Sequence, residues 1–250
     1  MRKKFIVGNM KMNKLPSEIG PYIERLKPLV KDAEGDVVLC VPSTNIQNAV
    51  LHTKGTNIKV GAQNMYWKAQ GAFTGAVSPL MIKDLGAEYV LVGHSERRQL
   101  FIETDWSVNK KVAAALEYGL TPIVCIGENL EQRAHNRIEE VIIVQLSLAL
   151  RDIPKHDIHK IIIAYEPLWA IGTGQTPKKE EVNEIIGWVR EKIRTSYGEK
   201  IAEEMIIQYG GSVNATNSKR FFNMPEIDGG LVGGACLEPE EFAKIINYND

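Results

Sequence analysis

One carboxylate, Glu166, lies where an apolar run of the chain ends. The stretch "AYEPLWAIGTGQTP" (164–177) continues the run "IIIAY", stops it with Pro167, and then passes through Trp169 into the small residues "AIGTG". Such a carboxylate has the parts of a general base, because burial beneath a loop that excludes water can tune its pKa. We therefore expect a base at Glu166 and a lid over residues 168–174.

The elements that must position this base are predicted from the hydrophobic pattern. Short apolar runs predict eight strands, at 5–9, 37–41, 58–62, 89–93, 122–126, 161–166, 205–209 and 229–233. Between them lie stretches with apolar residues three and four apart, which predict helices such as "SEIGPYIERLKPLV", "SVNKKVAAALEYG", "IEEVIIVQLSLALRD", "KEEVNEIIGWVREKI" and "EEFAKIINY", and another near 79–86. Strands that are apolar on nearly every residue belong to a parallel sheet covered on both faces.

Eight such units in 250 residues predict an α/β fold, a (β/α)₈ barrel, with residues 1–250 forming a single domain. An open doubly wound sheet is the alternative architecture. It favours a glycine-rich turn after the first strand, whereas the first strand here ends in "GNMKMN".

In such a barrel the chemistry lies at the C-terminal ends of the strands. The polar residues and glycines that follow the predicted strands are Asn9, Lys11, His94, Ser95, Glu96, Arg97, Glu166, Gly210, Gly211, Ser212, Gly233 and Gly234. Any one of them, taken alone, is more simply a solvated side chain, a structural histidine or a turn. Because all of them are expected at one rim of the barrel, together they predict a site.

Two glycine clusters indicate a phosphate site. The cluster before Ser212 and the pair Gly233 and Gly234 follow the last two strands, where this fold often holds phosphate. Glycines let backbone N–H groups approach an anion closely. Gly172, in the loop after Glu166, could add a further donor. The substrate is therefore expected to be a small phosphorylated metabolite.

Lys11 and His94 are the rim groups that can polarise a carbonyl. The sequence "SERR" after His94 opens a helix, and the positive end of a helix disfavours imidazolium, so we expect a neutral ring that donates a hydrogen bond. Lys11 supplies a fixed positive charge for an enediolate oxygen and for phosphate. With Glu166 as base, this set predicts proton abstraction next to a carbonyl.

Seven motifs resemble, in order and over essentially the whole chain, those of the triosephosphate isomerase family: "GNMKMN", "GAFTGAVS", "LVGHSERR", "CIGE", "AYEPLWAIGTG", "YGGSV" and "GGLVGGA". The resemblance implies an intramolecular aldose–ketose isomerase that interconverts dihydroxyacetone phosphate and D-glyceraldehyde 3-phosphate, a step of glycolysis and gluconeogenesis. It implies no cofactor and no metal.

The resemblance also implies a role for each matching residue. Glu166 is the base that moves the proton between C1 and C2, His94 is the electrophile that shuttles the oxygen protons, and Lys11 is the electrostatic anchor with Asn9 beside it. Gly172, Ser212, Gly233 and Gly234 hold the phosphate. Ser95 and Glu96 are supporting residues, with Glu96 near Lys11.

Four positions depart from the family pattern. Met10 stands where tryptophan is common, and Cys236 takes a usual serine position after the phosphate glycines. The lid ends in "GQTP" (174–177) rather than in a sequence closer to Gly-Lys-x-Ala. Ala76 replaces a glutamate that in the family pairs with an arginine of the partner subunit, equivalent to Arg97. We nevertheless expect a homodimer, because "GAFTGAVS" is too long and apolar for a simple connection, and because the resemblance implies that this segment projects into the neighbouring subunit.

Composition suggests neither nucleic acid nor a membrane as a partner. A net charge of −1 gives no basic surface for nucleic acid or an anionic membrane, and no apolar stretch is long enough to span a bilayer. Cys40, Cys125 and Cys236 are too few and too scattered for a disulfide framework or a zinc site. Free buried thiols in a reducing compartment, the cytoplasm, are the expectation.

Three other functions remain open at this point. A Schiff-base aldolase needs a lysine within a barrel strand, and Lys59 lies early in its strand. A metal-dependent hydrolase favours a His-x-His pair at a strand end, whereas His156 and His159 precede the sixth strand. A non-catalytic homologue that serves as a binding surface is the third; the presence of Glu166 and its partners argues against it.

Overall fold

The computed structural model describes residues 2–170 and 176–249. Its eight strands are β1 (Phe5–Asn9), β2 (Asp36–Val41), β3 (Ile58–Ala62), β4 (Tyr89–Val92), β5 (Thr121–Ile126), β6 (Ile162–Tyr165), β7 (Ile207–Tyr209) and β8 (Gly229–Val232). All neighbouring pairs are parallel, and β1 pairs with β8, so the sheet closes into a barrel. The predicted (β/α)₈ fold is confirmed, and each predicted strand matches to within two residues.

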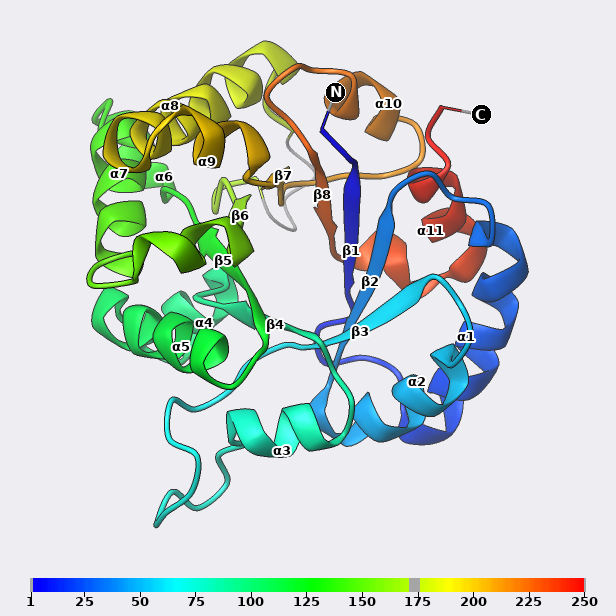
Figure 1. The fold of residues 1–250 in the computed structure, drawn as a ribbon. Coiled ribbons are helices and arrows are strands. Elements are labelled where there is room, and N and C mark those ends of the chain that lie inside the picture. The colour runs from blue at the N-terminus through cyan, green and yellow to red at the C-terminus, as the bar shows by residue number, and fades with distance from the viewer. Residues whose placement is uncertain (1, 171–175, 250) are drawn as a thin grey trace.

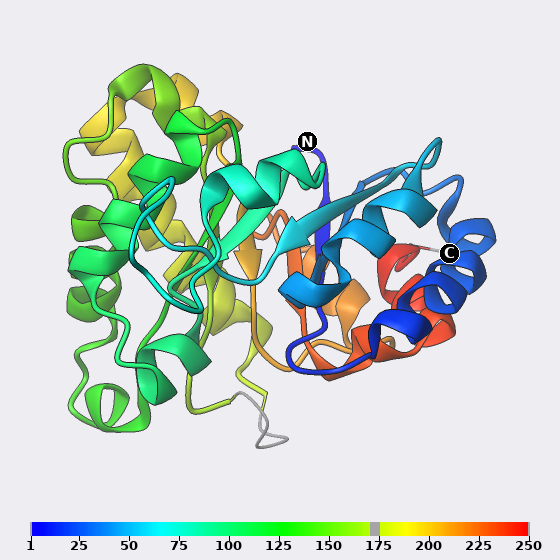
Figure 2. The same cartoon turned by 90° about the horizontal axis from the view of Figure 1, so that it is seen from below.

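Helices surround this barrel (Figure 1). They are α1 (Pro16–Val30), α2 (Ile46–Thr53), α3 (Pro79–Asp84), α4 (Ser95–Leu100), α5 (Asp105–Glu117), α6 (Leu130–Ala134), α7 (Ile138–Ala149), α8 (Lys179–Tyr197), α9 (Glu199–Glu204), α10 (Ser218–Phe222) and α11 (Pro239–Ile246). Short 3₁₀ helices cover η1 (Ser43–Asn45), η2 (Lys155–Lys160) and η3 (Gly234–Leu237). Figure 2 shows α1 (blue) beside α11 (red), so the first and last long helices complete the ring.

Two apolar layers follow from the alternation of side chains along each strand. Strand residues such as Phe5, Val7, Ile162 and Ala164 form a cluster with no helical members, which is the barrel interior. Their neighbours in sequence, such as Ile6, pack outward against the helices. The parity of each strand therefore decides which polar side chain at its end points into the barrel.

The three cysteines are buried and free, as expected. In the described part of the chain, no helix combines the length and apolar character needed to cross a membrane.

The seam between β1 and β8 depends on Gly229. Its φ is +144°, and a Cβ added there would lie 2.0 Å from the carbonyl oxygen of Phe5. We expect Gly229→Ala to lower the free energy of unfolding by about 2–4 kcal/mol, because it combines backbone strain with overpacking. Urea unfolding at fixed protein concentration measures this loss.

Gly187→Ala, in α8, is the matched control, since the nearest atom to its added Cβ is 3.8 Å away. It should leave stability unchanged or slightly higher. Equal stability of the two variants would show that the seam tolerates a side chain.

Candidate active site

Alternation along β6 and β1 brings Glu166 and Asn9 into the mouth of the barrel. Glu166 continues the inward series of Ile162 and Ala164, and Asn9 continues that of Phe5 and Val7. Both side chains are buried, Glu166 to 2% exposure. The first residue after β6 therefore falls at an inward position, which brings the Glu166 carboxylate into the mouth of the barrel.

Glu166 contacts the residues that follow β4. Its Oε1 lies 2.9 Å from Nε2 of His94, and its Oε2 accepts a hydrogen bond of 3.0 Å from the backbone N–H of Ser95. Burial raises the pKa of Glu166, but the charge and hydrogen bonds of His94 and the N–H of Ser95 outweigh it, so the pKa lies below its ordinary value. Ser95 thus contributes its main chain to this contact.

His94 is turned toward Glu166 by a break in the β4 alternation. Gly93 has a φ of +71°, a conformation that favours glycine, and His94 then caps α4. The backbone N–H of Glu96 donates to Nδ1 of His94 over 3.3 Å. Since Nδ1 accepts, the ring proton lies on Nε2, which faces Oε1 of Glu166.

The protonation of His94 differs in part from the sequence prediction. The acceptor role of Nδ1 agrees with a ring that donates through Nε2. However, the helix start was expected to disfavour imidazolium, whereas the pKa of His94 is raised: burial lowers it, but the Glu166 carboxylate raises it by more. A close carboxylate outweighs the start of a six-residue helix.

Lys11 is held in a strained conformation. Its φ is +52°, and its backbone N–H donates to Oδ1 of Asn9 over 3.0 Å. Its Nζ donates to Oε1 of Glu96 over 2.6 Å. Nε2 of Gln63 donates to the carbonyl oxygens of Lys11 (2.9 Å) and Cys40 (3.0 Å). Strain of this kind persists only where the surroundings fix it, which is typical of functional sites.

Sequence reasoning missed Gln63. It directly follows β3, so it obeys the same strand-end pattern that identified the other rim residues. The residues that follow β3 were not among those predicted to form the site at the rim.

Two different structural reasons explain why glycines occupy these positions at the rim. A Cβ at Gly210 would lie 2.8 Å from Cγ of Glu166, and one at Gly211 would lie 2.1 Å from the Tyr209 hydroxyl, so these two allow close packing. A Cβ at Gly233 would lie 3.2 Å from Cε of Lys11, and one at Gly234 would meet nothing within 4 Å. Gly234 therefore faces open space, whereas Gly233 lies against the end of the Lys11 side chain. Ser212, which follows β7, is half-buried. Gly172 lies outside the described residues.

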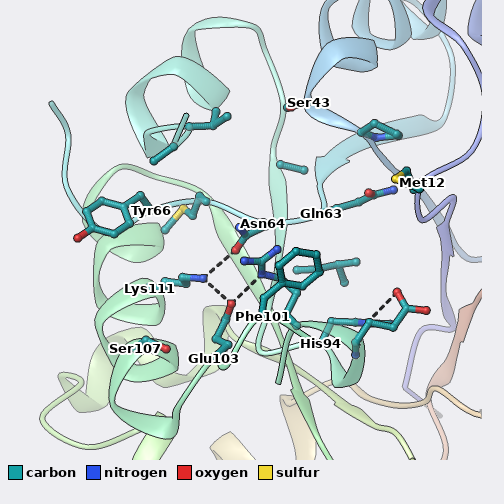
Figure 3. Close-up of a pocket in the computed structure, with 18 of the residues that line it drawn as sticks. Met12, Ser43, Gln63, Asn64, Tyr66, His94, Phe101, Glu103, Ser107 and Lys111 are labelled. Carbon is teal, nitrogen blue, oxygen red and sulfur yellow. Dashed lines mark hydrogen bonds and ion pairs between the residues drawn. The ribbon is translucent and has the colours of Figure 1, made fainter. Parts of the chain in front are cut away.

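A cavity of about 740 Å³ opens beside this group and includes Asn9, Lys11, His94 and Glu96 in its lining (Figure 3). Its lining also includes Trp67 and Phe101. Its wall carries a buried ionic cluster, in which Glu103 and Lys111 are joined (Figure 3).

Comparison with known proteins shows which family the chain belongs to. The chain matches the family model described as triosephosphate isomerase over residues 4–249. It is similar to the triosephosphate isomerases of Acetivibrio thermocellus (51% identical over 248 residues, covering 99% of each chain), Clostridium botulinum (50%, covering 99% of this chain and 100% of the relative) and Caldanaerobacter subterraneus subsp. tengcongensis (50%, with the same coverage). The chain belongs to the triosephosphate isomerase family. It is therefore an isomerase, as the resemblance predicted.

Membership in the triosephosphate isomerase family makes the departures informative. Met10 is fully buried, so its side chain serves packing. The Cys236 carbonyl accepts a hydrogen bond of 2.5 Å from the Tyr22 hydroxyl. Ala76 lines the cavity, and Arg97 pairs within the chain with Oε2 of Glu103 over 2.8 Å.

The lid expected at 168–174 falls mostly outside the described residues, which end at Ala170 and resume at Thr176. Pro177, in the segment that follows, is buried.

The alternative enzyme classes find no support in the described residues. Lys59 lies at the start of β3 and pairs at 3.1 Å with Glu88, which precedes β4, so it lies at the end of the strands opposite the rim. His156 and His159 are exposed in η2, before β6. Across residues 2–170 and 176–249, no group of three or more His, Cys, Asp or Glu side chains is placed to hold a metal ion.

Proposed function

We propose that this isomerase interconverts dihydroxyacetone phosphate and D-glyceraldehyde 3-phosphate through an enediolate, with Glu166 as base, His94 as electrophile and Lys11 as electrostatic anchor. The observation that carries the proposal is the buried 2.9 Å contact between Glu166 Oε1 and His94 Nε2 at the mouth of the barrel. A substrate placed between the two groups replaces this contact, so that one faces a carbon-bound proton and the other a carbonyl oxygen.

In the forward direction Glu166 takes the proton from C1 of dihydroxyacetone phosphate, and the C–H electron pair becomes the C1–C2 double bond of the enediolate. His94 Nε2–H and the Lys11 ammonium stabilise the negative charge that develops on the C2 oxygen. His94 then moves a proton between the two oxygens, and Glu166 returns its proton to C2. Once Glu166 faces substrate, the pKa of His94 loses the contribution that raises it, which favours the neutral ring.

The activity is tested with glyceraldehyde 3-phosphate in an assay coupled to reduction of dihydroxyacetone phosphate. Run in D₂O, the same reaction should place deuterium on the product carbon that Glu166 reprotonates. Turnover without deuterium incorporation would contradict a base that exchanges with solvent. The absence of turnover would favour the non-catalytic alternative.

The phosphate is proposed to bind at Gly172, Ser212, Gly233 and Gly234, and Ser95 and Glu96 to support the catalytic groups. Gly233→Val should raise KM by about tenfold or more, because the added side chain lies between the backbone and the anion and also presses on Cε of Lys11, 3.2 Å from its Cβ. Titration with inorganic phosphate separates the two effects, since only loss of the anion site weakens phosphate binding. Unchanged phosphate affinity would remove this loop from the site.

The active form is proposed to be a homodimer. The loop between β3 and α3 projects away from the barrel (Figure 1, cyan), with Phe73 partly exposed against Tyr66. The large apolar side chains exposed near the cavity include Met12, Leu100, Phe101, Ile102 and Trp106. A second copy's loop around Thr74 would fill the cavity and cover these side chains, and Ala76 only removes one ion pair from such a contact.

Sedimentation velocity tests the dimer. The unmodified chain should sediment as a dimer at micromolar concentration, and Phe101→Asp should shift it toward monomer with a parallel loss of activity. A fully active monomer at nanomolar concentration would refute the proposal. The buried free thiols support a cytoplasmic setting for the enzyme.

A further inference from the structure

Arg133, on α6, occupies a position that the proposed chemistry does not explain. Its guanidinium carbon lies 4.4 Å from the ring centroid of Trp169. Its NH1 is 3.4 Å from Oε1 of Glu128, and its NH2 forms an ion pair with Glu181 in the first turn of α8. One side chain therefore joins nearby Glu128 to Trp169 and Glu181, which come from much later in the sequence.

Glu128 is the buried centre of this group. Its Oε1 also accepts a hydrogen bond of 2.8 Å from Nε1 of Trp169 and one of 3.3 Å from the hydroxyl of Tyr165. Glu128 is fully buried, and burial raises its pKa, while the hydrogen bonds and the charge of Arg133 oppose that change. Arg133 is thus the cation that partners a buried carboxylate.

The same segment fixes the backbone on both sides of Glu166. The N–H of Glu166 donates to the carbonyl of Ile126 (2.8 Å), and the N–H of Leu168 donates to that of Glu128 (3.0 Å). A Cβ at Gly127 would lie 1.7 Å from the carbonyl oxygen of Glu166, so the two strands' ends touch. Any shift of Glu128 or Trp169 is passed directly to the backbone that carries the Glu166 side chain.

We propose that Arg133 is a positioning residue for Glu166, acting through Glu128 and Trp169. The inference rests on the proposed role of Glu166 as base. The planar guanidinium stacks on the indole and bridges two carboxylates at once, and an ammonium group cannot do both. We call the contacts of Arg133 with Glu128, Trp169 and Glu181 the Arg133 clamp. Loss of this clamp displaces the Glu166 carboxylate and leaves the phosphate site unchanged, so it affects the chemical step more than substrate binding.

Arg133→Met and Arg133→Lys test the proposal. Arg133→Met should lower kcat by about tenfold with KM changed by less than about twofold, because a small displacement of a base is costly while binding is spared. Arg133→Lys retains the charge but not the stacking on Trp169, so its kcat should lie between that of Arg133→Met and that of the unmodified chain. Arg137→Met is the matched control, since Arg137 pairs with exposed Glu140 and should leave kcat unchanged.

A double-mutant cycle excludes simple unfolding as the cause. Glu181→Gln should lower kcat in the normal background and have no further effect beside Arg133→Met, if both act through one clamp. An Arg133→Met protein with kcat within twofold of normal overturns the inference, as does a loss confined to KM or additive effects of the two changes. Glu166→Asp is measured in parallel. If Glu166→Asp stays fully active, Glu166 is not the base. If Glu166→Asp loses activity while Arg133→Met keeps it, Glu166 can still be the base, and only the positioning role of Arg133 is wrong.

Discussion

We expect Glu166→Asp to lower kcat by about 10²-fold or more, with KM changed only modestly. The shorter side chain withdraws the carboxylate by roughly 1 Å, and displacement on that scale can cost about 10²-fold in rate. In the structure both oxygens of Glu166 are occupied, one 2.9 Å from His94 Nε2 and one 3.0 Å from the Ser95 N–H, so the carboxylate has little freedom to compensate.

Steady-state kinetics with glyceraldehyde 3-phosphate measures this effect. Glu140→Asp, at an exposed position on α7, serves as the control and should keep full activity. An Asp variant at position 166 with near-normal kcat would mean that another group abstracts the proton. A large rise in KM with normal kcat would assign Glu166 to binding.

The second large effect is expected at Glu103, which is buried beside Gly93, the residue before His94. Its Oε2 accepts from Nζ of Lys111 (2.6 Å) and Nε of Arg97 (2.8 Å), and its Oε1 accepts from the N–H of Gly93 (3.1 Å). Lys111 also donates to Oδ1 of Asn64 (Figure 3). Glu103→Gln should lower the free energy of unfolding by about 3–5 kcal/mol, because it leaves the buried Lys111 ammonium without a counter-charge.

Urea unfolding at fixed protein concentration measures the loss at Glu103. Lys111→Met added to Glu103→Gln should recover much of it, since no unpaired buried charge then remains. If the single variant is as stable as the unmodified chain, Lys111 must find another partner or lose its proton at little cost.

The same cluster predicts how stability depends on pH. Burial raises the pKa of Glu103, but the neighbouring Lys111 and Arg97 charges lower it by more, so its net pKa lies below 4.5. The folded state therefore binds this proton less readily than the unfolded state. The ionised Glu103 therefore stabilises the folded state fully above about pH 4.5, which is the ordinary pKa of a glutamate. This contribution to stability is lost as the pH falls toward the lower pKa of Glu103 in the folded state. Glu103→Gln should show a shallower loss of stability below pH 5.

The sequence predicted the barrel and the rim for a local reason. Strand identity and the residues that end each strand depend on neighbours in sequence, and alternation then sends Glu166 and Asn9 inward. The short helices α2, α6, α9 and α10 carry too few apolar repeats to be recognised. Glu128 meets Tyr165 and Trp169 from 37 and 41 positions along the chain, so the Arg133 clamp became visible only in three dimensions. Glu103 meets Arg97 and Lys111 within eight positions, but these two residues lie on the different helices α4 and α5, whose relative placement no local pattern reveals.

The direct contact between Glu166 and His94 could not be predicted from the sequence either. Strand ends place both residues on one rim, but the turn at Gly93 decides which of its neighbours faces the carboxylate. Gly210 illustrates the opposite case, because a glycine predicted for phosphate proves to make room for Cγ of Glu166.

The pairing of β1 with β8 also bears on when the molecule becomes active during synthesis. Lys11 follows the first strand, and Gly233, whose added Cβ would lie 3.2 Å from it, follows the last. A nascent chain on the ribosome can form early strand pairs, but it cannot bring these two residues together until β8 has left the exit tunnel. Closure is a contact of maximal sequence separation, which makes it entropically late. Ribosome-bound chains that stop before β8 should accordingly remain inactive and expose an unpaired β1 edge, which is the stage at which a chaperone has most to protect.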